Sequence, residues 1–478
     1  ETGMQGAKPF PEGFTRWGKM QPDLAKPVDF GPLDALVREY QEAGLTDLTF
    51  GLRYDHGKAS VNATTGGAFL GNANSQPRPE YLEAFDAWLR AMVERYDGDG
   101  VDDMPGLVAG VEYWELGVEY SSYVPESGSE YVSLLERAFR VMHEAGGDAI
   151  RVAHAAFLVA GPIEGVTDPS EYPAAIAGGP AKIRTKRYDE IELILSRPDL
   201  TDVWNIHSLG DPSEIDHLVR WLRWEEEQRG ISPKPIIVSD TSASPYVAFG
   251  IGTTCTGPLH AIPIYPATAA DHCRIADYFK ALVDGDAEAE AFARKQTAED
   301  SVKKIVIAAS NGVLLINSAF TEDIDYLKGG VLGLGIPAGA GFGGWAGILD
   351  VHRNAATQQR TVKGRYPGFY AMRQLLGWLE GYTSLRRVDT GDDRVRLYSI
   401  ERLDSTSWIA WFDPKAPVLP GDAVSYELAL PDVKGKVVME NLLSGVGEKE
   451  PVERDGVASR IVLSDTPVFI TRTADRRR

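Results

Sequence analysis

Cysteine is the first scarcity in this sequence, because its 478 residues include only Cys255 and Cys273. Two cysteines cannot form the disulfide framework of a small secreted domain, and they leave open one bridge or two buried thiols. They also lack the CxxC spacing of a zinc site. Long apolar runs are missing too, since no stretch reaches the roughly 20 residues that a membrane-spanning helix requires. We therefore expect no zinc cluster and no insertion into a membrane.

Basic residues are the second scarcity. Lysine and arginine number 49 against 69 aspartates and glutamates, which gives a formal net charge of −20. Nucleic-acid phosphates and anionic lipids repel such a chain, so neither is an expected partner. Neutral partners such as carbohydrates fit this charge better, although an acidic surface also simply keeps a protein soluble. The composition leaves the oligomeric state undetermined.

The hydrophobic pattern divides the chain into two parts. In the first part, short branched and aromatic runs alternate with helical segments, which is the signature of parallel β/α architecture. In the second part, short runs of period two are separated by turn residues, as in a β-sandwich. We therefore expect an α/β fold, with a (β/α)8 TIM barrel over residues 8–383 and an all-β sandwich domain over residues 384–474. The strands expected in the barrel are 14–17, 46–52, 111–117, 148–154, 202–208, 235–240 and 312–317.

Seven strands are one fewer than a closed barrel needs. Residues 1–13 are too few, and too rich in glycine and proline, for an obvious strand and helix. Either the first strand is missing, or an unrecognised segment closes the barrel, or the barrel is open at that point. Glu1-Thr2-Gly3 before Met4 resembles the remnant of an expression tag, which is consistent with a missing N-terminal segment.

Two of the expected strands end in carboxylates. The aromatic and branched run Val111 to Tyr120 places Glu119 at its C-terminal end, and the strand 235–240 ends at Asp240. In a β/α barrel the C-terminal ends of the strands build the active site. Two carboxyl groups can hydrolyse a glycosidic bond, one protonating the leaving oxygen while the other, ionised, attacks the anomeric carbon. The pattern therefore indicates glycoside hydrolysis, with no cofactor needed for catalysis.

Several segments resemble the clan A glycoside hydrolases, which are retaining enzymes built on a (β/α)8 barrel. The resemblance is carried by Thr15 to Gly18, Phe30 to Val37, the Trp-Glu-x-Gly-x-Glu pattern of Trp114 to Glu119, Trp345 to Asp350, and Leu463 to Phe469. It implies a hydrolase of β-linked oligo- or polysaccharides, with Glu119 as the general acid/base and Asp240 as the nucleophile. Retention requires the two carboxyl groups to lie about 5 Å apart.

The same resemblance gives supporting roles to other residues near strand ends. Glu115 resembles a buried glutamate that pairs with an arginine, and Arg16 is its expected partner. For any single histidine, a purely structural role is the alternative to sugar binding. The candidates for sugar contacts are His207, Asn205, His154, Arg53, His56 and Trp345.

Two positions depart from the pattern of clan A. Val118 stands where the clan has an asparagine that binds the sugar, and Asp240 stands where the clan has a glutamate nucleophile. The shorter side chain moves its oxygens back by roughly 1.5 Å, towards the wider separation of an inverting enzyme. The alternative function is therefore a carbohydrate-binding pseudoenzyme on the same fold. For either function we expect a secreted or periplasmic location rather than a cytoplasmic one.

An acidic run from Asp97 to Asp103 contains four aspartates in seven residues, with glycines between them. Hard oxygen ligands on a backbone that turns sharply suit Ca²⁺. Val108 takes the twelfth position, where an EF-hand has a glutamate, so the run is not a complete EF-hand. The alternative is an ordinary acidic turn. The predicted ligands of a structural calcium ion are Asp97, Asp99, Asp102 and Asp103.

Overall fold

Helices and parallel strands alternate through most of the chain, and antiparallel strands follow the helix α12 (Pro367–Leu379). The chain is therefore a mixed α/β protein with parallel sheets, as its pattern predicted. The computed structural model describes residues 1–9, 12–61, 75–120, 124, 126–159, 163, 165–178, 188–241, 268–317, 320–323, 344–353, 360–430, 437–443, 453–456 and 461–472.

The first sheet contains four parallel strands that are neighbours in chain order. They are β1 (Gly6–Ala7), β2 (Asp47–Leu52), β3 (Tyr113–Glu119) and β4 (Arg151–Ala156). β1 pairs with β2 from Gly6↔Asp47, and Tyr113 of β3 pairs with Thr49 on one side and Arg151 on the other. Because the strands are parallel, their C-terminal ends meet at one edge of the sheet.

A second parallel sheet contains β5, β6 and β7, and isolated bridges at Ala153↔Val203 and Phe157↔Ile206 join β4 to β5. After β7, β8 pairs in parallel with β9, and β9 pairs in antiparallel fashion with β10. Among the described strands no ladder joins β9 to β1. The bounds of these strands are β5 (Trp204–Ser208), β6 (Ile236–Thr241), β7 (Leu315–Ile316), β8 (Phe320–Glu322), β9 (Gly347–Arg353) and β10 (Arg360–Arg365).

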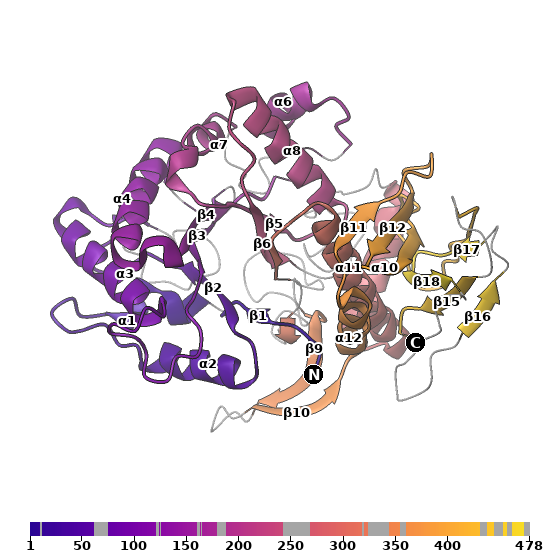
Figure 1. The fold of residues 1–478 in the computed structure, drawn as a ribbon, viewed down its shortest axis with the longest axis horizontal. Helices are drawn as coiled ribbons and strands as arrows, with labels where there is room; N and C mark the ends of the chain where they lie inside the picture. The colour runs from indigo at the N-terminus through magenta and orange to yellow at the C-terminus, as the bar shows by residue number, and fades with distance from the viewer. Residues whose placement is uncertain are drawn as a thin grey trace.

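Helices lie outside an arc of strands, as Figure 1 shows for α2, α3, α4 and α8. Local sequence fixes several helix starts, because Ser127 with Glu130, and Thr268 with Asp271, form capping boxes that satisfy free backbone N–H groups. The helices are α1 (Trp17–Met20), α2 (Gly31–Glu42), α3 (Leu82–Tyr96), α4 (Gly128–Gly146), α6 (Tyr172–Ala177), α7 (Tyr188–Leu195), α8 (Glu214–Arg229), α10 (Ala269–Val283), α11 (Ala287–Ser310) and α12. Short 3-10 turns cover Glu12–Thr15, Pro79–Tyr81, Gly147–Ala149, Pro169–Glu171 and Pro198–Leu200.

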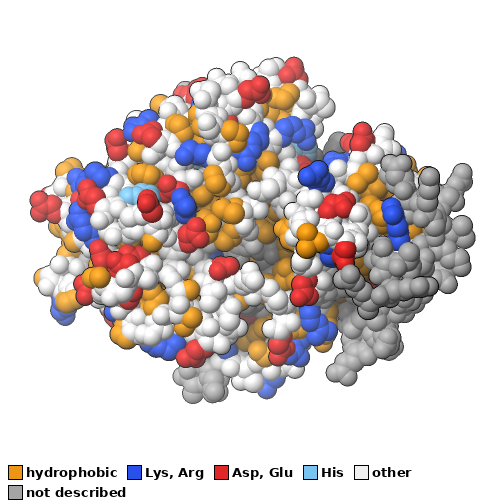
Figure 2. Space-filling model, in the orientation of Figure 1, with side chains coloured by type: hydrophobic (Ala, Val, Ile, Leu, Met, Phe, Trp, Pro, Cys, Tyr) orange, Lys and Arg blue, Asp and Glu red, His pale blue; other side chains and the backbone are white. Residues whose placement is uncertain are grey.

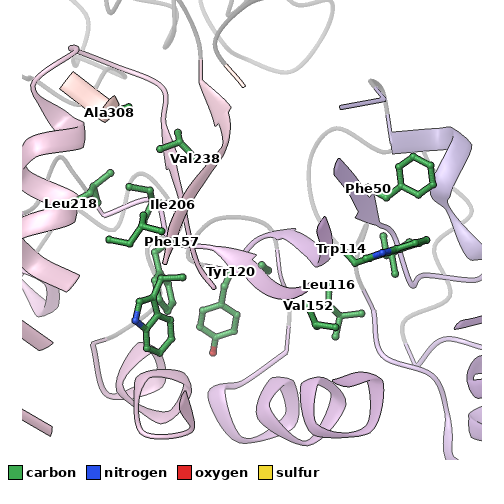
Figure 3. Packing of buried hydrophobic residues seen from close by; sticks show 14 of the residues in the cluster. Phe50, Trp114, Leu116, Tyr120, Val152, Phe157, Ile206, Leu218, Val238 and Ala308 are labelled. Carbon is green, nitrogen blue, oxygen red and sulfur yellow. The ribbon is translucent and has the colours of Figure 1, made fainter. Parts of the chain in front are cut away.

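The two faces of the parallel strands bury different side chains. Figure 3 shows Trp114, Leu116 and Val152 between the strands and the helices, and all three are fully buried there. The opposite face carries a separate small cluster that includes Tyr113 and Ala153. Because side chains alternate along a strand, the next residue of β3 on this second face is Glu115. On the face away from the helices, an apolar layer that includes Tyr113 and Ala153 is thus followed by a polar layer nearer the C-terminal ends of the strands.

The C-terminal part is built from antiparallel strands, seen on the side of Figure 1 opposite to α3 and α4. Six of them form a sheet in the order β11-β12-β13-β18-β15-β16, and β14 pairs separately with β17. This part contacts the helices through the stacked rings of Trp378 and Phe469, 4.9 Å apart, and through an ion pair between Arg396 and Asp216. The strands are β11 (Ser384–Arg387), β12 (Val395–Glu401), β13 (Thr406–Phe412), β14 (Tyr426–Leu428), β15 (Val437–Asn441), β16 (Glu453–Gly456), β17 (Ile461–Leu463) and β18 (Val468–Arg472).

The main error of the sequence prediction lies at the N-terminus. The segment 14–17 is not a strand but the end of a 3-10 turn and the start of α1, with Arg16 forming only an isolated bridge to Arg53. The neighbour of β2 is β1 instead, in the region judged too short for a strand. Two residues of glycine and alanine show no hydrophobic period, so their strand state depends on pairing with β2.

Three further features bear on the expectations from composition. Cys273 is disulfide-bonded, which selects one bridge over two thiols. No helix within the described residues is both long and apolar enough to cross a membrane. Figure 2 shows acidic side chains interspersed with lysines and arginines on the face in view, rather than gathered in one patch.

Candidate active site

A buried polar cluster occupies the inner face of the parallel strands. Glu115 and Glu119 come from β3, His207 from β5, Ser239 from β6, and Lys8 from the residue after β1. The two glutamates, the histidine and the serine are each at most 3% exposed. The strands thus bring together residues that are far apart in sequence, at the edge where their C-terminal ends meet.

Irregular pairing in two strands shapes this cluster. In β3 the register shifts between Leu116 and Glu119, where Gly117 has a φ of +91°, a conformation that favours glycine. In β6 the register shifts so that His207 stands opposite Asp240, which leaves Ser239 as the additional residue. Bulges of this kind redirect side chains and are common beside active sites.

His207 connects the two glutamates. Its Nδ1–H donates to Glu119 Oε1 at 3.0 Å, and its Nε2–H donates to Ser239 Oγ at 2.9 Å. Ser239 Oγ–H in turn donates to Glu115 Oε2 at 3.1 Å, and Lys8 Nζ donates to the same oxygen at 2.7 Å. A continuous hydrogen-bonded chain therefore runs from Lys8 to Glu119.

The charges in this cluster are strongly coupled. Burial alone lowers the pKa of His207, but hydrogen bonds and the negative charges of Glu115 and Glu119 outweigh it and raise this pKa to about 9. Burial raises the pKa of Glu115, but Lys8 and then His207 outweigh it and lower this pKa to about 2. At neutral pH the cluster therefore contains an imidazolium next to the Glu115 carboxylate, and both histidine nitrogens act as donors.

Glu119 keeps one oxygen free of protein partners. Oε1 accepts the hydrogen bond from His207, whereas Oε2 is buried and has no hydrogen-bond partner among the described residues. Asn205 presents a second such atom, since its Oδ1 is also buried without a partner, two residues before His207 on the same face of β5. Buried acceptors without donors are unfavourable, so both atoms suit a ligand that brings hydroxyl groups.

Asp240 is partly exposed at the end of β6. Its negative charge acts on the buried ammonium of Lys304 from α11, where it raises the pKa of Lys304 against the larger lowering effect of burial. Lys304 also donates to the backbone oxygen of Ser208 at 2.9 Å. Asp240 is one of four carboxylates, with Glu214, Asp300 and Asp211, whose negative charges act on Lys304 in this way.

The expected partner of Glu115, Arg16, instead pairs with Asp55, to which its Nε donates at 2.6 Å. Lys8 takes the place predicted for Arg16. Sequence reasoning missed Lys8 because the short strand before it carries no hydrophobic signal. It also missed Ser239. Because side chains alternate along β6, the residue before Asp240 points to the other face of the strand and was a further candidate.

Three predicted sugar-binding residues are held by the protein itself. Both ring nitrogens of His56 bond to backbone groups, since Nε2 lies 2.9 Å from the oxygen of Gln21 and Nδ1 accepts from the N–H groups of residues 58 and 59. His154 packs against Phe157, with the two ring centroids 4.3 Å apart, and burial lowers the pKa of His154 to about 4. Trp345 is 4% exposed and lies in a cluster with residues of α10 and α11, so its ring is a packing element rather than an open sugar platform.

Arg53 lies at the end of β2, where its backbone oxygen accepts from Trp17 N–H at 2.8 Å and its positive charge lowers the pKa of Asp55 against the larger effect of burial. It therefore belongs to the group around Asp55. Of the six residues predicted to contact sugar, His207 and Asn205 lie with Glu119 on the inner face. The alternation of sides along β2 places Arg53 on that face as well, because Gly51 pairs with Glu115.

The acidic run after α3 brings three of its four aspartates together. One carboxylate oxygen from each of Asp97, Asp99 and Asp103 lies within 4.8 Å of the others. Asp102 is not in this group, and its φ of +54° places it in the left-handed region. The predicted set of four ligands is thereby reduced to three.

No protein-family profile and no curated protein match the sequence. Solved structures do resemble the fold. A GH86 protein in complex with neoagarooctaose aligns with a TM-score of 0.51 and 12% identity, over 98% of this chain and 69% of that chain. A glucosidase from Croceicoccus marinus aligns with a TM-score of 0.49 and 12% identity, over 99% of this chain and 90% of that chain. A GH39 β-xylosidase from Caulobacter crescentus aligns with a TM-score of 0.45 and 13% identity, over 93% of this chain and 83% of that chain.

The GH86 structure, with its TM-score of 0.51, aligns over nearly the whole of this chain. The resemblance inferred from the residues is therefore confirmed for the fold, at low sequence identity. The activities in the names of these neighbours belong to those proteins.

Proposed function

We propose that the chain is a glycoside hydrolase that acts on a β-linked oligo- or polysaccharide, with Glu119 as the proton-transferring residue and Asp240 as the second carboxylate. The observation that carries this proposal is the environment of Glu119. One of its oxygens accepts a hydrogen bond from His207, and the other is buried without a hydrogen-bond partner in the part of the chain that the structure describes. A carboxyl group fixed in this way can present its second oxygen to a glycosidic oxygen.

The chemistry follows from the roles of two carboxyl groups. In a retaining reaction Glu119 donates a proton to the leaving oxygen while Asp240 attacks the anomeric carbon, and Glu119 then takes a proton from the water that releases the sugar. His207 holds Glu119 in place through the hydrogen bond from its Nδ1–H to Oε1. The unsatisfied Oδ1 of Asn205 suits a sugar hydroxyl.

The architecture of this proposal has two domains. The parallel strands from β1 to β9 and their helices form a (β/α)8 barrel, in which the short consecutive strands β7 and β8 count as one. The strands from β11 to β18 form a sandwich that begins near residue 384. The parallel order of the strands and the shared face of Glu115, His207 and Ser239 support the barrel. The disulfide at Cys273 supports a secreted or periplasmic location, because disulfides persist in oxidising compartments.

A panel of aryl β-glycosides tests the function. We expect turnover by the unmodified protein, and a loss of at least about 100-fold in kcat/KM on Glu119→Gln and on Asp240→Asn. Glu112→Gln is the matched control, because Glu112 is an exposed residue next to the same strand and the substitution removes the same charge. Full turnover in Glu119→Gln would refute the assignment of the proton-transferring residue.

One observation favours the alternative of a carbohydrate-binding protein without catalysis. Val118 and Asp240 stand where the clan A pattern has a sugar-binding asparagine and a glutamate nucleophile, so neither of these residue types is kept. A protein of this kind binds oligosaccharides saturably but turns over no member of the panel. Its binding is weakened by Asn205→Ala and is indifferent to Asp240→Asn, whereas the hydrolase depends on both residues.

A further inference from the structure

The loop that follows α3 is folded around carboxylates. Both oxygens of Asp103 accept backbone N–H groups, from Gly98 at 3.0 Å and from Gly100 at 2.7 Å. Asp99 accepts from Val101 N–H at 2.7 Å, and Asp97 accepts from Asp99 N–H at 3.3 Å. These bonds give the loop its shape and bring three negative side chains close together.

One carboxylate in this loop is not fully satisfied by the hydrogen bonds of the described residues. Asp97 is only 7% exposed, and its Oδ2 is buried with no hydrogen-bond partner among the described residues. No lysine or arginine is recorded as an ion-pair partner of Asp97, Asp99 or Asp103 within the described part of the chain. The nearby Arg95 directs its Nε and one terminal nitrogen to Asp34. Its other terminal nitrogen donates to the backbone oxygen of Asp103 at 3.4 Å rather than to a carboxylate.

We propose that Asp97, Asp99 and Asp103 bind one calcium ion. Their carboxylate oxygens lie within 4.8 Å of one another, which matches ligands around one ion with Ca–O distances of about 2.3–2.6 Å. Oxygen-only ligands suit calcium, which accepts a flexible geometry, better than magnesium, which demands a near-ideal octahedron. The buried carboxylate of Asp97 thereby gains a positively charged partner.

The position of the site gives the ion a structural role. The loop connects the end of α3 to the start of β3, and Val111 N–H donates to the oxygen of Tyr96 at 2.7 Å across its base. Gly98 lies directly against Gly110, since a Cβ on Gly98 would come within 3.0 Å of Gly110 Cα. Calcium therefore stabilises the connection that positions β3, the strand carrying Glu115 and Glu119. This inference does not depend on the proposed hydrolysis.

Calcium binding to the full-length protein after treatment with a chelator tests the site. We expect isothermal titration calorimetry to show one calcium per chain, and thermal unfolding to show a Tm that rises with calcium and changes little with the same concentration of magnesium. Asp97→Asn should weaken calcium binding by at least about tenfold and remove the rise in Tm. Asp99→Asn, at an exposed position, should weaken binding as well and guards against a folding defect in the buried variant.

Asp102→Asn is the matched control, because it removes the same charge from the same loop outside the ligand group. It should retain calcium affinity within about twofold. Equal weakening by Asp102→Asn and Asp97→Asn would show that calcium responds only to the net charge of the loop. That result, a preference for magnesium, or the absence of saturable binding overturns the proposal.

Discussion

The positive charge of His207 makes a testable contribution to the pH dependence of stability. The hydrogen bonds and charges of two glutamates raise the pKa of this fully buried histidine from its usual 6.5 to about 9 in the folded protein. The difference corresponds to about 3 kcal/mol, since one pKa unit is worth about 1.4 kcal/mol. Because the folded-state pKa lies above the unfolded value, this stabilisation is complete below pH 6.5 and is lost as the pH rises through 9.

The substitution His207→Gln removes the titration but keeps a neutral hydrogen-bond donor. Urea unfolding followed by tryptophan fluorescence at pH 6 and at pH 9.5 measures the free energy of unfolding of both proteins. We expect the unmodified protein to exceed the variant by about 3 kcal/mol more at pH 6 than at pH 9.5. A difference that is the same at both pH values would refute the reasoning, because it would mean that the folded imidazole is neutral.

His154 provides a control of opposite sign. It is also fully buried, but burial lowers its pKa to about 4. Its contribution to stability is therefore present above pH 6.5 and is lost as the pH falls through 4. His154→Gln should leave the stability change between pH 6.5 and 9.5 as it is in the unmodified protein.

Three further predictions follow from buried or constrained residues. Lys8→Met removes the main partner of the buried Glu115 and should reduce the free energy of unfolding by about 3–5 kcal/mol in urea titrations; a loss below about 1 kcal/mol would contradict this pairing. Burial raises the pKa of Asp300 to about 7, so its ionisation destabilises the fold as the pH rises from 4 to 7, and Asp300→Asn should raise Tm at pH 8 more than at pH 5. Gly117→Ala places a side chain at a φ of +91° and within 3.1 Å of Ala155 Cβ. Urea titrations should therefore show a loss of about 1–3 kcal/mol in the free energy of unfolding. An unchanged stability would mean that the bulge tolerates a side chain.

The sequence predicted elements with a strong local pattern and failed where tertiary contacts decide. β3 was predictable because a run rich in aromatic and branched residues is bounded by loop residues, and the observed strand Tyr113–Glu119 differs from the predicted 111–117 only at its ends. β1 was not, since Gly6 and Ala7 become a strand only through pairing with β2. Lys8 was missed with it, although it neutralises Glu115.

The site was predicted unevenly for a related physical reason. Glu119 and His207 end buried strands, and strand ends gather at one edge whatever the details of packing. Whether a histidine at a strand end faces the interior depends on side-chain alternation and on bulges. His154 fell on the helix side, where it packs against Phe157, and His56 was taken up by the backbone of its own loop.

The direction of Asp240 decides between the two proposed functions. If it is the attacking carboxylate, it is one methylene shorter than the glutamate that the clan A pattern has at this position, and a misplacement of about 1 Å can slow a reaction by about 100-fold. We therefore expect Asp240→Glu to raise kcat on aryl β-glycosides by about 10- to 100-fold, with retention of configuration detectable by NMR of the first-formed sugar. If Asp240 serves Lys304 instead, Asp240→Glu leaves turnover unchanged and shifts only the stability of the contact with α11. Unchanged turnover in both Asp240→Glu and Asp240→Asn would remove Asp240 from the reaction while leaving the role of Glu119 intact.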